Sequence, residues 1–377
     1  MDIAGTDPRT GDHFDYYAFV PEPLPTEVNL SQATWTVASL AAEALGRLNQ
    51  ACTQLRNPGL LIAPSLFKES VSTSALEGTY GALPEVLEAR LPQFSPRTPE
   101  VKEIQAYHEM ARLAFDWAVD RPITLGMLKD LQRILAEGSK KPPPDAGQIR
   151  TRQVIIGPEN CTVHDARFVP PPPDDRLQAG LDAWQEWINA DLQLPGVVRA
   201  AMAHYQFECL HPFSDGNGRV GRLVIILMLL RDGSLPAPSL TISPWLLKRR
   251  EEYQDHLLRV SQTGDWNPWV QFMCTALREQ CLAHVEVAQR LLDWTTNLRA
   301  QLDDRRWGGV ITKLAEQLID WPVVTGRWVV ETFNVTLPTA QNAIDRLMNL
   351  GVLTEMTGSN YNRVYGAKEV MDLVDSL

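Results

Sequence analysis

The stretch that decides the interpretation of this chain is residues 211–222, which read His211-Pro212-Phe213-Ser214-Asp215-Gly216-Asn217-Gly218-Arg219-Val220-Gly221-Arg222. Apolar segments flank it at 197–210 and 223–230, and each is long enough for a buried helix. The stretch combines a titratable base, a carboxylate four residues later, two glycines around an asparagine, and two arginines three residues apart. We expect a loop that carries chemistry, held between two core helices.

These residue types are typical of a phosphate site. Gly216 and Gly218 let the backbone turn so that amide N–H groups converge on an anion, and a following helix directs its positive end to the same point. Arg219 and Arg222 lie one helical turn apart and can bind further phosphate oxygens. A glycine-rich turn beside a structural histidine is the alternative, but it leaves the combination unexplained.

The same loop offers a metal ligand and a base. Asp215 supplies the hard oxygen that Mg²⁺ prefers when substrate phosphates complete its coordination. His211 stands at the entrance of the loop and can act as general base on a hydroxyl near neutral pH. The other histidines show no metal-ligand spacing.

Composition restricts the class of protein. The chain has 377 residues and a net charge of −11, which argues against broad affinity for nucleic acid or anionic membranes. Its five cysteines form no C-x-x-C pair, so a disulfide framework or structural zinc is not expected. The N-terminus lacks the pattern of a signal peptide, and the most apolar run, 223–230, is too short to span a bilayer. We therefore expect a cytoplasmic protein without membrane contact.

Hydrophobic periodicity predicts a mainly α-helical fold. Residues 1–30 form an expected extended arm, because three prolines at 21, 23 and 25 block helix formation. Helices are expected from Ser31, which is a suitable N-cap, and then at 64–76, 98–119, 124–136, around 181–188, and at 243–260, 266–286 and 288–304. The break at Trp307-Gly308-Gly309 separates the last part of the chain.

Two stretches before the loop favour extended structure. Residues 148–157 are rich in β-branched side chains and end at Gly157, which predicts a short β-hairpin or flap. Residues 168–173 contain four successive prolines and must be polyproline-like.

After residue 310, helical and strand patterns alternate with the spacing of a winged-helix domain. Helices are expected at 311–318, 329–333 and 337–350, and the two wing strands at 351–355 and 362–365. The segment from Val310 to Leu377 holds five Lys and Arg against eight Asp and Glu, a net charge of −3. Because phosphate neutralisation supplies most non-specific DNA affinity, this charge disfavours DNA binding and favours a protein-interaction module.

The loop resembles the motif of the Fic/Doc family, H-x-F-x-[D/E]-G-N-G-R-x-x-R, at every defined position. The resemblance extends to the lead-in helix 203–208, the flap at 147–157, the proline run 168–173, and segments 250–253 and 264–266. In all, about 30–375 resembles the long bacterial members of that family. The resemblance implies an N-terminal arm and Fic N-terminal segment at 1–110 with an inhibitory helix at about 64–78. It further implies an all-helical Fic core with its flap at 111–287, a linker helix at 288–309, and a winged-helix-like domain at 310–377.

The resemblance implies a protein adenylyltransferase, which transfers AMP from ATP, with Mg²⁺, to a Ser, Thr or Tyr hydroxyl of a target protein. His211 would deprotonate that hydroxyl, and Asp215 would hold the metal ion. The flap residues Val154 and Ile155 would pair with the backbone of the target. The implied nucleotide-binding set is Gln206, His211, Pro212, Phe213, Ser214, Asp215, Gly216, Asn217, Gly218, Arg219, Arg222 and Tyr253.

A second motif concerns regulation. Thr73-Ser74-Ala75-Leu76-Glu77-Gly78 resembles the inhibitory pattern of the family, [S/T]-x-x-x-E-[G/N]. The implied role is that Glu77 pairs with Arg222 and keeps the γ-phosphate of ATP from binding productively.

Two alternatives remain open at this stage. The same site could remove AMP as a phosphodiesterase, or the chain could be a transcriptional regulator or toxin–antitoxin component that acts through its tail. Self-modification and a homodimer are both compatible with the sequence, and the target protein is not identified by it.

Overall fold

The computed structural model describes residues 2–6, 13–54, 59–91, 94–96, 98–118, 121–158, 161–358 and 363–377. The predicted mainly α-helical fold is confirmed. The helices are α1 (Gln32–Gln54), α2 (Gly59–Leu76), α3 (Leu83–Glu88), α4 (Pro99–Ala118), α5 (Leu125–Glu137), the short 3-10 helix η1 (Val163–Asp165), α6 (Asp175–Asn189), α7 (Gly196–Leu210), α8 (Asn217–Arg231), α9 (Ser243–Leu247), α10 (Arg250–Thr263), α11 (Asn267–Asp304), α12 (Val310–Gln317), α13 (Gly326–Phe333), α14 (Leu337–Asn349) and α15 (Lys368–Asp375). The strands are β1 (Asp2–Thr6), β2 (His13–Tyr17), β3 (Val323–Thr325), β4 (Thr354–Glu355) and β5 (Val364–Gly366).

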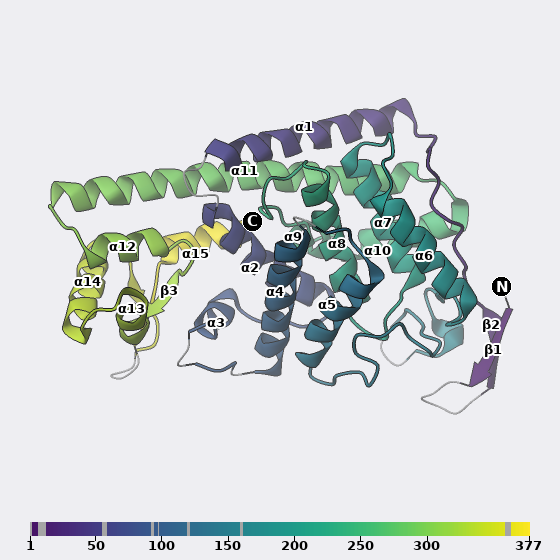
Figure 1. Cartoon of the computed structure of the whole chain (residues 1–377), viewed down its shortest axis with the longest axis horizontal. Coiled ribbons are helices and arrows are strands. Elements are labelled where there is room, and N and C mark those ends of the chain that lie inside the picture. Colours follow the sequence, from purple (N-terminus) through teal and green to yellow (C-terminus); the bar gives the residue numbers. More distant parts are fainter. Residues whose placement is uncertain are drawn as a thin grey trace.

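Helices α7 and α8 form the centre of the molecule and pack against each other (Figure 1). Both are apolar on nearly every side, and most of their side chains are buried. A helix that is apolar all round must be enclosed by other elements. Helices α1, α2, α4, α5, α6 and α11 supply that enclosure through contacts with one or both of them. The loop 211–216 between them is therefore fixed at both ends by core helices.

Helix α11 differs from the prediction, because the helices expected at 266–286 and 288–304 are one continuous helix, Asn267–Asp304. Its sequence has no glycine, and its single proline stands at the second position, where a missing N–H is harmless. Helix α1 runs alongside it for most of its own length (Figure 1). None of the helices in the described part of the chain combines the length and apolar composition that crossing a bilayer requires.

The N-terminal arm contains a strand pair that the sequence analysis did not predict. Strands β1 and β2 are antiparallel, with Asp2 opposite Tyr17, and the buried Ile3 packs in a small cluster with Ala18 and Val169. Beyond β2 the arm is extended, as expected, and is fastened by hydrogen bonds such as Phe19 N to Val169 O, 2.9 Å.

The flap contains less β-structure than the sequence predicted. The expected hairpin at 148–157 reduces to one antiparallel bridge, between Ile156 and Phe168. Prolines explain the short pairing, because Pro158 and the run 170–173 have no N–H to extend a ladder. The backbone of Arg152–Ile155 forms no backbone hydrogen bond with another described residue.

The C-terminal segment consists of α12 to α15 around a three-stranded sheet in the order β3-β5-β4. Of the expected wing strands, Thr354–Glu355 pairs with Val364–Gly366, whereas Asn362 lies outside the described residues. The winged-helix assignment and the domain boundaries stay predictions. Helix α15 was not expected, and it contacts α2 and α11. The guanidinium of Arg90 also joins the two parts, because it lies over the rings of Phe67 and Trp321.

Candidate active site

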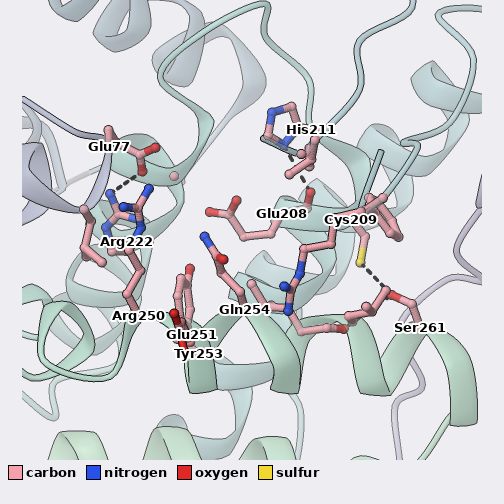
Figure 2. Close-up of a pocket in the computed structure, with 18 of the residues that line it drawn as sticks. Glu77, Glu208, Cys209, His211, Arg222, Arg250, Glu251, Tyr253, Gln254 and Ser261 are labelled. Carbon is pink, nitrogen blue, oxygen red and sulfur yellow. Dashed lines mark hydrogen bonds and ion pairs between the residues drawn. The ribbon is translucent and has the colours of Figure 1, made fainter. Parts of the chain in front are cut away.

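A cavity of about 470 Å³ opens between the two central helices and α10. Its walls come from the end of α2, residues 156–158 and 167–168, the end of α7, the start of α8, and α10. This volume lies in the range of small-molecule sites. Figure 2 shows Glu77 and Arg222 on one side of the cavity and His211 on another.

His211 lies at the end of α7, where the helix stops because this residue adopts a left-handed conformation, φ 48° and ψ 60°. Its Nδ1 is 3.3 Å from the carbonyl oxygen of Glu208. Burial, together with the nearby charge of Arg150, lowers the pKa of His211 to about 4. The ring is therefore neutral at physiological pH. When Nδ1–H donates to Glu208 O, Nε2 keeps a lone pair and can accept a proton.

Arg150 holds this end of the loop in place, and the sequence analysis assigned it no role. Its side chain is buried and donates to four carbonyl oxygens: His211 O at 2.8 Å, Leu210 O at 3.4 Å, Pro171 O at 2.6 Å and Arg152 O at 3.2 Å. Its backbone N also donates to Pro212 O, at 2.9 Å. Arg150 thus joins the flap, the proline run and the loop.

The loop closes on itself through Asn217. The side chain of Asn217 accepts a hydrogen bond from Phe213 N at 2.8 Å and donates one to Phe213 O at 2.7 Å. Gly216, with φ 83°, precedes α8 as its N-cap, and within the described residues no side chain caps the first turn. The first N–H groups of α8 therefore stay available to an anion. The buried side-chain amide of Asn217 therefore positions the backbone of the loop, and its contact with phosphate stays a prediction.

Arg222 occupies the opposite side of the cavity and forms an ion pair with Glu77. Its Nη2 donates to Glu77 Oε1 at 2.7 Å and to Thr73 O at 3.1 Å, and its Nε donates to Thr73 Oγ1 at 2.8 Å. Burial raises the pKa of the Glu77 carboxyl, but the charge and hydrogen bond of Arg222, with Arg219 and His211, bring it below its ordinary value. Glu77 therefore stays ionised.

The position of Glu77 explains why residue 218 is glycine. A Cβ at Gly218 would lie 2.2 Å from Glu77 Oε1 and 2.8 Å from Arg222 Nη1. Any side chain there would displace the ion pair. Helix α2 ends at Leu76, so Glu77 directly follows the helix, and Gly78, with φ 88°, turns the chain away.

Arg219 is not one of the residues that line the cavity, and its contact with phosphate stays a prediction. Its buried guanidinium pairs with Glu103 of α4 and lies 3.6 Å from Asp215 Oδ2. Glu103 is distant from Arg219 in the sequence but adjacent to it in the fold. Asp215 is half exposed, and its Oδ1 accepts a hydrogen bond from Gly216 N at 2.7 Å. In the described part of the chain, no three His, Cys, Asp or Glu side chains form a metal cluster.

Tyr253 lines the cavity as expected, whereas Gln206 does not. Tyr253 shares a hydrogen bond of 2.7 Å with Nε2 of the buried His204. Gln206 is also buried, but its Nε2 donates to Glu22 O in the N-terminal arm, at 2.9 Å. The side-chain amide of Gln206, which was expected to line the nucleotide pocket, is thus hydrogen-bonded to the carbonyl oxygen of Glu22.

The remaining predicted residues support the loop from behind the cavity. Pro212 and Phe213 are buried, and Ser214 Oγ donates to Asp145 Oδ2 at 2.6 Å. In the flap, Ile155 packs against the cluster of Ile3 and Val169, while Ile156 lines the cavity. Of the predicted nucleotide-binding set, His211, Gly218, Arg222 and Tyr253 line the cavity, as does the inhibitory residue Glu77.

Two family models match the sequence. The description "Fic/DOC family" covers residues 122–229, and "Fic/DOC family N-terminal" covers residues 35–116. Together the two matches span just over half of the chain, include the whole His211–Arg222 loop, and contain the segment that carries Glu77. The chain belongs to the Fic/DOC family.

Curated relatives and solved structures agree with this assignment. "Protein adenylyltransferase fic-1" of Caenorhabditis elegans is 36% identical over 133 residues, which are 35% of this chain and 23% of that protein. "Protein adenylyltransferase Fic" of Culex quinquefasciatus is 36% identical over 137 residues, 35% of this chain and 24% of the relative. The matched regions thus span about a quarter of these relatives. The crystal structure of a Fic family protein from Desulfovibrio desulfuricans shares the fold, with a TM-score of 0.59, 20% identity, and coverage of 91% of this chain and 98% of that chain.

Proposed function

We propose that this protein transfers AMP from ATP to a hydroxyl group of a target protein. The observation that carries the proposal is one cavity onto which three functions converge: a neutral base at His211, the uncapped N-terminus of α8, and the cation of Arg222. A base and an anion site on the same cavity are what phosphoryl-type transfer requires, because catalysis there consists of positioning and charge stabilisation. The curated relatives named protein adenylyltransferase support the same reaction.

In the proposed reaction, Nε2 of His211 accepts the proton of the target hydroxyl. The oxygen then attacks the α-phosphorus of ATP, the bond from that phosphorus to the bridging oxygen breaks, and pyrophosphate leaves. The first amide groups of α8 and the guanidinium of Arg222 would bind the phosphates. Asp215 would hold Mg²⁺; a single half-exposed carboxylate suits an ion carried mainly by substrate phosphates and water. The bound ion would neutralise phosphate charge.

Glu77 would inhibit this reaction by competing for Arg222. The carboxylate already accepts a hydrogen bond from Nη2 of the guanidinium at 2.7 Å, so a phosphate could bind that nitrogen only after Glu77 moves. The backbone of Arg152–Ile155 makes no backbone–backbone hydrogen bond within the described residues, which supports the prediction that Val154 and Ile155 pair with an extended segment of the target. The C-terminal segment, with its net negative charge, would position a protein partner in preference to DNA.

The test is transfer of labelled AMP from ATP labelled at the α-phosphate, in the presence of Mg²⁺, with cell lysate as the source of targets. The Glu77→Gly protein should label itself or a target about 10- to 100-fold faster than the wild type, because a charge-assisted hydrogen bond contributes about 1.5–3 kcal/mol. Adding His211→Ala should lower that rate by about 10²–10⁴-fold, the usual contribution of a general base.

Three controls separate the alternatives. Glu85→Gly removes an exposed carboxylate nearby in the sequence and should leave the rate unchanged. ATP binding should survive His211→Ala, so full transfer by that variant would contradict the assigned base. Loss of label from a target that was modified beforehand would indicate the reverse reaction, and absence of any labelling would favour a regulatory role.

A further inference from the structure

Glu208 stands in the wall of the cavity, one turn before His211, and nothing in the proposed reaction uses it. Its Oε1 is buried and has no hydrogen-bond partner among the described residues. The same is true of Nδ1 of His204, which lies 3.9 Å away, beyond hydrogen-bonding distance. Buried polar atoms are nearly always paired, so this unpaired carboxyl oxygen calls for an explanation. Figure 2 shows it between His211 and Arg222.

The backbone of α8 passes close to this carboxyl. A Cβ at Gly221 would lie 2.6 Å from Glu208 Oε1 and 3.2 Å from His204 Nδ1. The absence of a side chain at residue 221 therefore leaves the space that Glu208 fills. Because Gly221 directly precedes Arg222, the carboxyl lies beside the start of α8, where the phosphates of the proposed substrate would bind.

The ionisable groups around Glu208 come from four elements, and the charged ones shift the pKa of Glu208 in opposite directions. His204 on α7 is neutral, since burial lowers its pKa to about 3, and His211 at the end of α7 is neutral as well. Arg222 on α8 favours an ionised Glu208, and Glu77 after α2 opposes it. Tyr253 on α10 stays protonated, because burial raises its pKa well above 10.

Burial has the largest effect on the pKa of Glu208. Although the charge of Arg222 lowers this pKa, burial and the charge of Glu77 raise it, and the result is a pKa of about 8. At pH 7 the group is therefore a neutral carboxylic acid that carries a proton to donate, and above pH 8 it is an anion. Two carboxylates and a polyphosphate around one arginine would repel one another strongly in so buried a place.

Building on the proposed AMP transfer, we propose that Glu208 is a positioning residue that admits the nucleotide only as a neutral acid. In that form it offers a hydrogen-bond donor to an oxygen of the nucleotide at the cavity wall. As a carboxylate it offers none, and its charge opposes the phosphates beside α8. Glu208 therefore sets the upper pH limit for nucleotide binding. Its ionisation lowers the affinity for the nucleotide and leaves the rate of the chemical step unchanged.

The test is the pH dependence of ATP affinity, measured by titration calorimetry with Mg²⁺ between pH 7 and pH 9. For the wild type, the dissociation constant should rise about tenfold over this range, because the neutral fraction of a group with a pKa of about 8 falls about tenfold. In Glu208→Gln the constant should stay flat, since the amide cannot ionise. In transfer assays KM for ATP should follow the same profile, with kcat unaffected.

Glu251→Gln is the matched control. Glu251 lines the same cavity from α10 but is exposed, so its variant should keep the steep profile of the wild type. Cys209, also in the cavity wall, does not titrate in this range, because burial raises its pKa to about 12.

A measurement on the unaltered protein makes the test independent of how the variant folds. At pH 8.5, ATP binding should take up protons, seen as a dependence of the binding heat on the ionisation enthalpy of the buffer. Equal pH profiles for wild type and Glu208→Gln, or binding without proton uptake, would overturn the role of Glu208. Absence of ATP binding at every pH would overturn the proposed function together with it.

Discussion

The two ends of the cavity control charge in opposite ways. At one end Arg222 keeps its charge, because Glu77 and Thr73 satisfy the guanidinium. At the other end His211 carries no charge at physiological pH, because burial and Arg150 lower its pKa to about 4. The difference teaches that a buried site can hold an anion receptor and a free base close together when one group is paired and the other is kept neutral. Three predictions test this contrast.

The largest effect is expected at the charged end. Arg222→Met should lower the free energy of unfolding by about 3 kcal/mol, because it removes the charged hydrogen bonds of a buried guanidinium to Thr73 and Glu77. Denaturant unfolding at pH 7 measures the loss, and Glu77→Gln in the same protein should restore part of it. Arg112→Met, which removes surface ion pairs of a side chain that is 56% exposed, should cost less than about 1 kcal/mol. Equal losses for Arg222→Met and Arg112→Met would refute the distinction.

A smaller effect is expected at the neutral end. Arg150→Met removes the donors to His211 O and Pro171 O and should cost about 2 kcal/mol of unfolding free energy, since buried acceptors are left unpaired. It also removes a positive charge near the ring, so the pKa of His211 should rise toward 6.5. Titration of the His211 ring by NMR would show this shift. Arg152 is an exposed neighbour, so Arg152→Met should leave both the unfolding free energy and the pKa of His211 unchanged. A shift of the His211 pKa in that variant would contradict the role assigned to Arg150.

The smallest effect is expected in the pH profile of the Glu77→Gly protein at saturating ATP. Because the pKa of His211 is about 4, the rate should fall by less than about twofold between pH 7 and pH 5.5. A histidine with the ordinary pKa of about 6.5 would lose about eightfold, since protonation removes the base as the pH falls. A drop of that size would show that the base is an ordinary exposed histidine.

Sequence patterns predicted the helical fold and the loop because both depend on neighbouring residues. Ser31 precedes α1 and accepts a hydrogen bond from Thr34 N as an N-cap should, and Gly78 turns the chain after α2. The Glu77–Arg222 pair was predicted by the resemblance to a family, since the two residues are far apart in the sequence. Helix α11 was divided wrongly at residue 287, although Val287 and Ala288 are both buried and no residue there breaks a helix.

The parts that were missed depend on contacts between distant segments. Arg150 bonds to carbonyl oxygens of His211 and Pro171, and carbonyl groups leave no trace in side-chain patterns. Arg219 pairs with Glu103 of α4, and the sequence shows no sign of a contact between residues so far apart. Glu208 is one of many glutamates in helices, and only its burial against Gly221 distinguishes it. Such roles follow from the packing of the fold.

Helix α11 gives the molecule a fixed length scale. At 1.5 Å per residue its 38 residues span about 57 Å, and this single rod touches α7 and α10 near the cavity as well as α12 and α15 in the C-terminal segment. A partner bound to that segment would therefore be presented to the cavity at a fixed distance and orientation. Which hydroxyl is modified would then depend on its distance from the bound part of the partner more than on the residues around it.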